Sequence, residues 1–283
     1  MPSTFHLDAG WLASSVIAIA FAILYPLVLA FIAHRRLNIS WKYFGYGALI
    51  FFLFQIISRV PIVTALGGVL APQLRASRVF LYIWLAVLAL TAGLFEEVGR
   101  YVGYRWLMRR EEKTWSKAVM YGIGHGGLES MVLIAGLGLL TLLNLIVLSS
   151  INLNSLPASQ HDQVVQQLKA LSAQPGWFPL IALWERLWTL PVQVALSVIV
   201  LQVFRRNNIG WLWLAILAHA VVDFVPVALL QVLGASTGVY LLVELIVAIF
   251  GATGVLVIWK LRDRPETKAL PEAQPGYTEM PGS

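Results

Sequence analysis

The chain has 283 residues, of which 59% are hydrophobic and only 12% are charged, and its formal net charge is +6. Soluble domains usually carry about 25% charged residues, so a water-soluble fold is excluded and much of the surface must face lipid. The absence of cysteine excludes disulfides, thiolate metal sites and a cysteine nucleophile.

Apolar stretches long enough to cross a bilayer, which takes about 20 residues, follow one another along the chain. They predict an all-α, polytopic transmembrane helix bundle of about seven spans. Pro61, Gly67 and Gly68 blur the end of the second span, and Pro226 marks a potential break in the sixth. The expected spans are residues 11–33, 43–64, 79–107, 118–150, 178–203, 209–232 and 238–259.

The polar parts of the chain are few. The segment 151–177 is expected to be an external loop that holds a short helix. We expect the transmembrane domain to comprise residues 1–264, followed by a disordered cytoplasmic tail, 265–283, that is rich in Pro, Gly and Glu. The first ten residues have no basic stretch, so no cleaved signal peptide is expected.

The distribution of Lys and Arg predicts the orientation, because cytoplasmic loops carry an excess of these residues. With the N-terminus outside and the C-terminus inside, thirteen basic residues fall on the inner side and four on the outer side. The outer residues are Arg59, Arg75, Arg78 and Lys169; the inner ones are Arg35, Arg36, Lys42, Arg109, Arg110, Lys113, Lys117, Arg205, Arg206, Lys260, Arg262, Arg264 and Lys268. A multi-pass protein of the cell inner (plasma) membrane is expected.

Ionisable residues lie inside the predicted spans, where each costs about 2.5–3.5 kcal/mol to insert. Three pairs are four residues apart and therefore share a helix face. At about 1.5 Å per residue, they lie about 11–21 Å from the cytoplasmic ends of their spans, in one layer. The expected site therefore contains Glu96, Glu97, Arg100, His125, Glu129, His219 and Asp223.

Purely structural roles are the alternative for these residues. Glu96 and Arg100 can form an intrahelical salt bridge, but one Arg cannot neutralise several carboxylates. Glu185 and Arg186 lie deeper and are better explained as a structural ion pair, to which Glu244 contributes if it pairs with Arg186. Glycines around His125, from Gly122 to Gly127, leave room either for a ligand or for a neighbouring helix.

Two hydrolytic designs use carboxylates and imidazoles without cysteine. In one, a glutamate is the general base for a water molecule while His and Asp stabilise the oxyanion. In the other, a divalent metal, with zinc the leading choice, lowers the pKa of a bound water. The two pairs His125 with Glu129 and His219 with Asp223 are the expected metal ligands.

Three motifs carry a family resemblance: Phe95–Arg100, Gly124–Glu129 and His219–Asp223. Their order resembles the YhfC family of intramembrane metalloproteases, grouped with the CAAX-processing, bacteriocin-processing and PrsW proteases. The resemblance covers residues 10–260. CAAX-type members space their Arg one residue further from the glutamates than Arg100, which favours the YhfC and PrsW side.

The resemblance implies an intramembrane protease in which Glu96 or Glu97 activates water and His219 and Asp223 assist. Because Glu96 shares a helix face with Arg100, we expect Glu96 to face the cavity as the base and Glu97 to support it. The resemblance favours a metal, while a metal-free glutamic mechanism stays open.

The partners expected are membrane lipid and a membrane-protein or peptide substrate, with no nucleic acid. Two other functions stay open. One is a non-catalytic scaffold or immunity protein, since one relative in this broad group is a non-catalytic subunit of γ-secretase. The other is a proton-coupled transporter, since buried carboxylates and His also relay protons.

Overall fold

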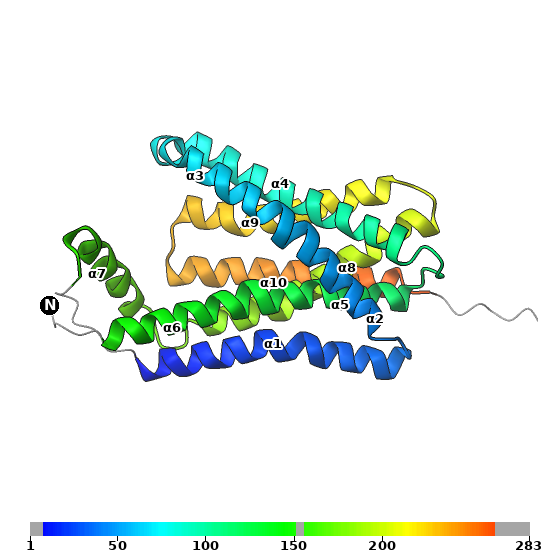
Figure 1. The fold of residues 1–283 in the computed structure, drawn as a ribbon, viewed down its shortest axis with the longest axis horizontal. Helices are drawn as coiled ribbons and strands as arrows, with labels where there is room; N and C mark the ends of the chain where they lie inside the picture. The colour runs from blue at the N-terminus through cyan, green and yellow to red at the C-terminus, as the bar shows by residue number, and fades with distance from the viewer. Residues whose placement is uncertain (1–7, 151–155, 264–283) are drawn as a thin grey trace, which may run out of the picture.

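The structure is a computed structural model that describes residues 8–150 and 156–263 (Figure 1). Every regular element in these two ranges is a helix, and seven continuous helical stretches are long and apolar enough to cross a membrane. The predicted seven-span helical bundle is therefore confirmed. Three of the stretches contain π-helical segments, labelled η.

The seven stretches follow the predicted order. They are α1 (Ala9–Leu37); α2 (Lys42–Phe51), η1 (Phe52–Arg59) and α3 (Val60–Ala76); α4 (Arg78–Val102) and η2 (Gly103–Leu107); α5 (Trp115–Glu129), η3 (Ser130–Gly136) and α6 (Leu137–Ser150); α8 (Leu180–Arg205); α9 (Gly210–Leu233); and α10 (Thr237–Lys260). The short α7 (Ala158–Ser172) lies in the predicted polar loop.

The uncertain end of the second span and the expected break in the sixth are both resolved by the structure. The second span continues through Pro61 to Ala76, since proline is compatible with the first turn of α3. Pro226 lies inside α9, which continues to Leu233. The predicted disordered tail, 265–283, and the first seven residues lie outside the described residues.

Polar side chains at the helix starts explain where several helices begin. Asp8 accepts a hydrogen bond from the backbone N–H of Trp11 at 2.7 Å, and Ser77 caps α4 in the same way. Thr114 and Ser236 cap α5 and α10. These side-chain oxygens satisfy N–H groups that have no partner within the helix.

Helix α8 is at the centre of the bundle, and nearly every residue from Leu190 to Val203 is buried. Helix α5 packs closely against it because glycines remove the side chains between them. A Cβ at Gly122 would lie 2.6 Å from Val194 Cα, and one at Gly126 would lie 2.7 Å from the Gln193 Cβ. The glycines around His125 therefore make room for neighbouring helices rather than for a ligand.

Substitution of Gly122 by Ala is expected to destabilise the protein by about 1–3 kcal/mol, because the added Cβ meets α8 backbone that must shift. Thermal unfolding of the purified protein in detergent measures the effect. Gly68→Ala is the matched control, since a Cβ there meets no atom within 4 Å and alanine favours the helix. Equal unfolding temperatures for the two variants would contradict the close packing of α5 against α8.

Helix α3 lies at the edge of the bundle beside the first part of α4 (Figure 1). None of its residues is buried. Arg59, at the end of η1, is by contrast only 8% exposed, and its guanidinium donates to Thr91 Oγ1 and to the Leu88 carbonyl of α4. Arg59, which was counted among the outer basic residues, is therefore a buried cation inside the bundle.

The N-out, C-in orientation stays a prediction, and removing Arg59 from the outer set strengthens the charge bias on which it rests. A reporter fused after Arg264 is expected to be active in the cytoplasm, and one inserted at Gln160 is expected to be active outside. An external reporter after Arg264 would overturn the orientation.

Candidate functional site

Three helices bring one buried carboxylate against two imidazoles. Glu96 of α4 accepts a hydrogen bond at its Oε2 from Nε2 of His125, on α5, at 2.9 Å. The Nε2 of His219, on α9, lies 3.9 Å from the same oxygen. The three residues are between 0% and 3% exposed. The sequence motifs that contribute them are far apart in the chain and meet at this single oxygen.

Glu97 lies beside Glu96 and has different partners. It accepts hydrogen bonds from Arg100 Nη1 and from His219 Nδ1, the latter at 2.6 Å. Since a carboxylate accepts, His219 Nδ1 carries the proton, and Nε2 is turned toward Glu96. Glu97 therefore fixes the orientation of His219 and compensates the charge of Arg100.

A hydrogen-bond network continues from this pair to the other side of the bundle. Arg100 Nη2 donates to the side-chain oxygen of Gln193, on α8, and the Gln193 amide donates to Glu129 at 2.6 Å. Arg186 then donates to Glu129 at 3.1 Å and to Glu185 at 2.5 Å. Buried charges along this path are thus paired or hydrogen-bonded, as burial requires.

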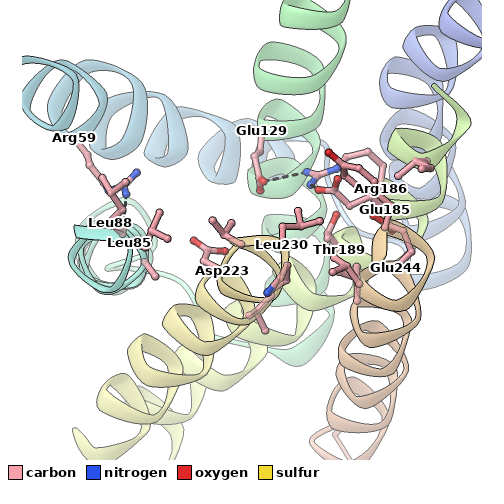
Figure 2. Close-up of a pocket in the computed structure, with 18 residues that line it drawn as sticks. Arg59, Leu85, Leu88, Glu129, Glu185, Arg186, Thr189, Asp223, Leu230 and Glu244 are labelled. Atoms are coloured by element: carbon pink, nitrogen blue, oxygen red, sulfur yellow. Dashed lines mark hydrogen bonds and ion pairs between the residues drawn. The ribbon is translucent and has the colours of Figure 1, made fainter. Parts of the chain in front are cut away.

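A cavity of about 470 Å³ borders the network and lies between η1, α4, α5, α8, α9 and α10. Figure 2 shows Arg59 and Asp223 on one side of it and Glu185, Arg186 and Glu244 on the other, with Glu129 between them. Asp223 is also 3.7 Å from His219 Nε2. Asp223 and His219 therefore connect the cavity with the buried Glu96.

The seven predicted site residues divide into two groups. The structure brings Glu96, Glu97, Arg100, His125 and His219 together in the buried cluster. Glu129 and Asp223 instead line the cavity, and Glu129 is held by Arg186 and Gln193.

The expectation that Glu96 faces the cavity is not met, since neither Glu96 nor Glu97 is part of the cavity wall. The two glutamates still differ. The Glu96 side chain keeps 4% exposure and the Glu97 side chain none, so Glu96 is the more accessible carboxylate.

The ion pair predicted between Glu185 and Arg186 is present. The suggested pairing of Glu244 with Arg186 is wrong, because no contact within ion-pair distance joins them among the described residues. Glu129 takes that position instead.

The predicted metal ligands do not assemble as a set. Glu129 is bonded to Arg186, away from His219. Across residues 8–150 and 156–263, no three His, Asp or Glu side chains lie close enough together to hold a metal ion. His125 and Glu96 are joined directly by a hydrogen bond, so an ion between them would have to displace it. The side chains in this arrangement do not fit a zinc site, which needs three ligand atoms at about 2.0–2.2 Å.

Two further residues belong to the site that sequence reasoning missed. Gln193 links Arg100 to Glu129, and Arg59 is the cation on the α4 side of the cavity. Both carried a signal, since each is a strongly polar residue within a long apolar helical stretch. Gln193 was overlooked because it carries no charge, and Arg59 because it was counted among the outer basic residues.

Comparison with known proteins places these motifs in one family. The family model described as YhfC intramembrane metalloprotease matches residues 21–247. A Bacillus subtilis (strain 168) protein, described as the uncharacterized membrane protein YhfC, is 31% identical over 245 residues, which covers 81% of this chain and 90% of the relative. No solved structure matches the chain. The wider likeness to CAAX-processing proteases stays a prediction.

Proposed function

This chain belongs to the YhfC intramembrane metalloprotease family, and from that premise we propose that it hydrolyses peptide bonds within or next to the bilayer. The observation that carries the proposal is the position of Glu96, a buried carboxylate whose Oε2 lies near imidazole nitrogens from two other helices. Buried ionisable groups are costly in membrane helices and are by default functional. The deciding experiment is cleavage by a Glu96→Gln variant, for which we expect loss of activity.

In the proposed reaction, Glu96 accepts a proton from a water molecule as the water oxygen attacks the carbonyl carbon of the substrate. The Nε2–H of His125 holds the Glu96 carboxylate in position. As the carbon–nitrogen bond breaks, the proton passes from Glu96 to the leaving nitrogen, so that one water is consumed and two termini form. Glu96 thus acts first as a general base and then as a general acid.

His219 is placed to assist this transfer. Its Nδ1 is bound to Glu97, and its Nε2 lies 3.9 Å from Glu96 and 3.7 Å from Asp223. The imidazole therefore connects the base to the cavity wall where a substrate arrives. Asp223, with a 40% exposed side chain, is the acidic group that such a substrate meets first.

The two rival functions are separated by simple measurements. A scaffold tolerates Glu96→Gln, since a side chain that is only 4% exposed contributes little to a partner-binding surface. A proton-coupled carrier loses transport in this variant but never generates new peptide termini. The buried cluster lies beside a cavity, to which Asp223 and His219 connect it, and this supports the hydrolase.

The metal requirement is open to a direct test. Because the donor side chains are hydrogen-bonded to one another rather than gathered around a common point, we expect cleavage to persist after chelation and dialysis. Element analysis of the purified protein is expected to give zinc well below one equivalent. About one zinc per chain, absent from His219→Ala, together with activity lost on chelation and restored by zinc, would overturn this expectation.

A further inference from the structure

Glu244 is a buried carboxylate that the proposed chemistry does not use. It lies on α10, about 10 Å from the start of the helix at about 1.5 Å per residue, and is 7% exposed. Its Oε2 is buried and has no hydrogen-bond partner among the described residues. A buried polar atom left without a partner costs about 1–3 kcal/mol, and more if it is charged. Such an atom points to a partner that arrives from outside the chain.

Two other orphaned polar atoms share the cavity with it. Thr189 Oγ1 and Arg186 Nε, both on α8, are buried and unpartnered within the described part of the chain. Thr189, Arg186 and Glu244 all line the 470 Å³ cavity, and Figure 2 shows them close together on the α8 and α10 side. This part of the wall therefore offers unsatisfied polar groups, whereas Glu129 nearby is fully engaged.

Glu244 also borders a second cavity. An apolar groove of about 520 Å³ is lined by Trp177, just before α8, and by residues of α8 and α10 that include Trp184, Leu241 and Leu245. It shares Ile181 and Glu244 with the polar cavity. Trp184 and Leu245 are 41% and 57% exposed, so the groove opens on the lipid-facing surface. Glu244 is thus the polar group at the junction of a lipid-facing groove with the cavity that leads to His219.

The charges of the polar cavity decide which group fits there. Its wall has four carboxylates and two guanidinium groups. Arg186 is already shared by Glu129 and Glu185, and Arg59 is bound to α4 on the other side. Within the part of the chain that the structure describes, Glu244 has no cation at ion-pair distance, so the complementary group is positively charged.

We propose that the junction at Glu244 is a specificity subsite that admits an apolar substrate segment from the lipid and binds one cationic group of it, a Lys or Arg side chain, at the Glu244 carboxylate. This inference rests on the proposed function for the identity of the occupant as a substrate. The apolar segment fills the groove, and the cation lies at the depth of Glu244. A basic residue then sets which part of the segment enters the cavity beside Asp223.

The probe is a peptide of about 20 Leu and Ala residues with a photoreactive side chain beside a single Lys, added to the full chain in lipid vesicles. The Lys is placed about seven residues from the peptide end that lies on the same side of the membrane as the start of α10, which matches the depth of Glu244. The reference peptide has norleucine at that position. Labelling of α8 and α10, mapped by mass spectrometry, is expected to be at least about tenfold stronger for the Lys peptide. The preference is expected to fall when the Lys is moved toward the centre of the peptide.

Three variants test the assignment. Glu244→Gln is expected to abolish the Lys preference, and Glu244→Lys is expected to transfer it to a peptide with Glu at that position. Glu185→Gln is the matched control, since Glu185 lines the same cavity but is already paired with Arg186. Equal labelling by both peptides in the wild type, or a preference that survives in Glu244→Gln, would overturn the inference.

The outcomes also separate this inference from the proposed hydrolysis. If membrane peptides are cleaved but labelling shows no preference for Lys, the subsite is rejected and the proposed hydrolysis is retained. A Lys preference that depends on Glu244, without new termini in any assay, supports the cation-binding junction while the hydrolase fails. Glu96→Gln, which leaves α8 and α10 unchanged, is expected to keep the labelling preference.

Discussion

Glu96→Gln is expected to lower the rate of peptide cleavage by about 10²–10⁴-fold, the usual contribution of a general base. The amide has nearly the shape of the carboxylate and keeps an oxygen that accepts the His125 hydrogen bond. It cannot accept a proton from water. Cleavage is measured as new termini by mass spectrometry, with the purified protein reconstituted into vesicles with a panel of single-span peptides.

The controls distinguish lost chemistry from lost structure. Glu96→Gln is expected to purify with wild-type yield and to unfold near the wild-type temperature. Glu111→Gln is the matched control. Glu111 pairs with Lys42 outside the buried cluster, and its side chain is 22% exposed. Wild-type cleavage by Glu96→Gln would reject the assigned base and favour a scaffold function.

Glu97→Gln is expected to destabilise the protein by about 3–5 kcal/mol, the usual cost of removing one partner from a buried ion pair. Arg100 is 0% exposed and loses its closest carboxylate, while His219 loses the group that orients it. The measurement is thermal or denaturant unfolding in detergent. Glu111→Gln is expected to change stability by less than about 1 kcal/mol, since its partner Lys42 is 46% exposed and solvent-accessible pairs contribute little.

A double variant shows whether the cost comes from the uncompensated charge of Arg100. Replacing both partners by uncharged side chains removes the unpaired cation, and such replacements are often nearly neutral. Glu97→Gln combined with Arg100→Met is therefore expected to be more stable than Glu97→Gln alone. A double variant that is less stable than either single variant would mean that the two residues act independently.

The residues of the buried cluster were largely predictable from spacing within each helix. Glu96 and Arg100, four residues apart, do face the same way and lie 3.8 Å apart. His219 and Asp223 also lie within 3.7 Å of one another. Helical periodicity alone dictates such neighbours, because residues i and i+4 share a face in any α-helix.

Spacing failed where the partner comes from another helix. His125 and Glu129 are four residues apart, yet His125 is bound to α4 while Glu129 is bound to α8. A metal shared by this pair therefore did not follow from the spacing. The roles of Gln193 and Arg59 were missed for the same reason, since each is defined by residues distant in sequence.

The sequence by itself determined that this is a multi-span membrane protein with an all-helical fold, because the length of the apolar stretches and the scarcity of charge leave no other way to satisfy the backbone in lipid. It also indicated five of the buried ionisable residues, Glu96, Glu97, Arg100, His125 and His219, although it missed Arg59. Only the tertiary structure decided their partners: Glu97 with Arg100 and His219, and Glu244 with no cation among the described residues. The rotation and tilt of each helix depend on side-chain packing between helices, as at Gly122 against Val194, and no periodicity within one helix encodes them.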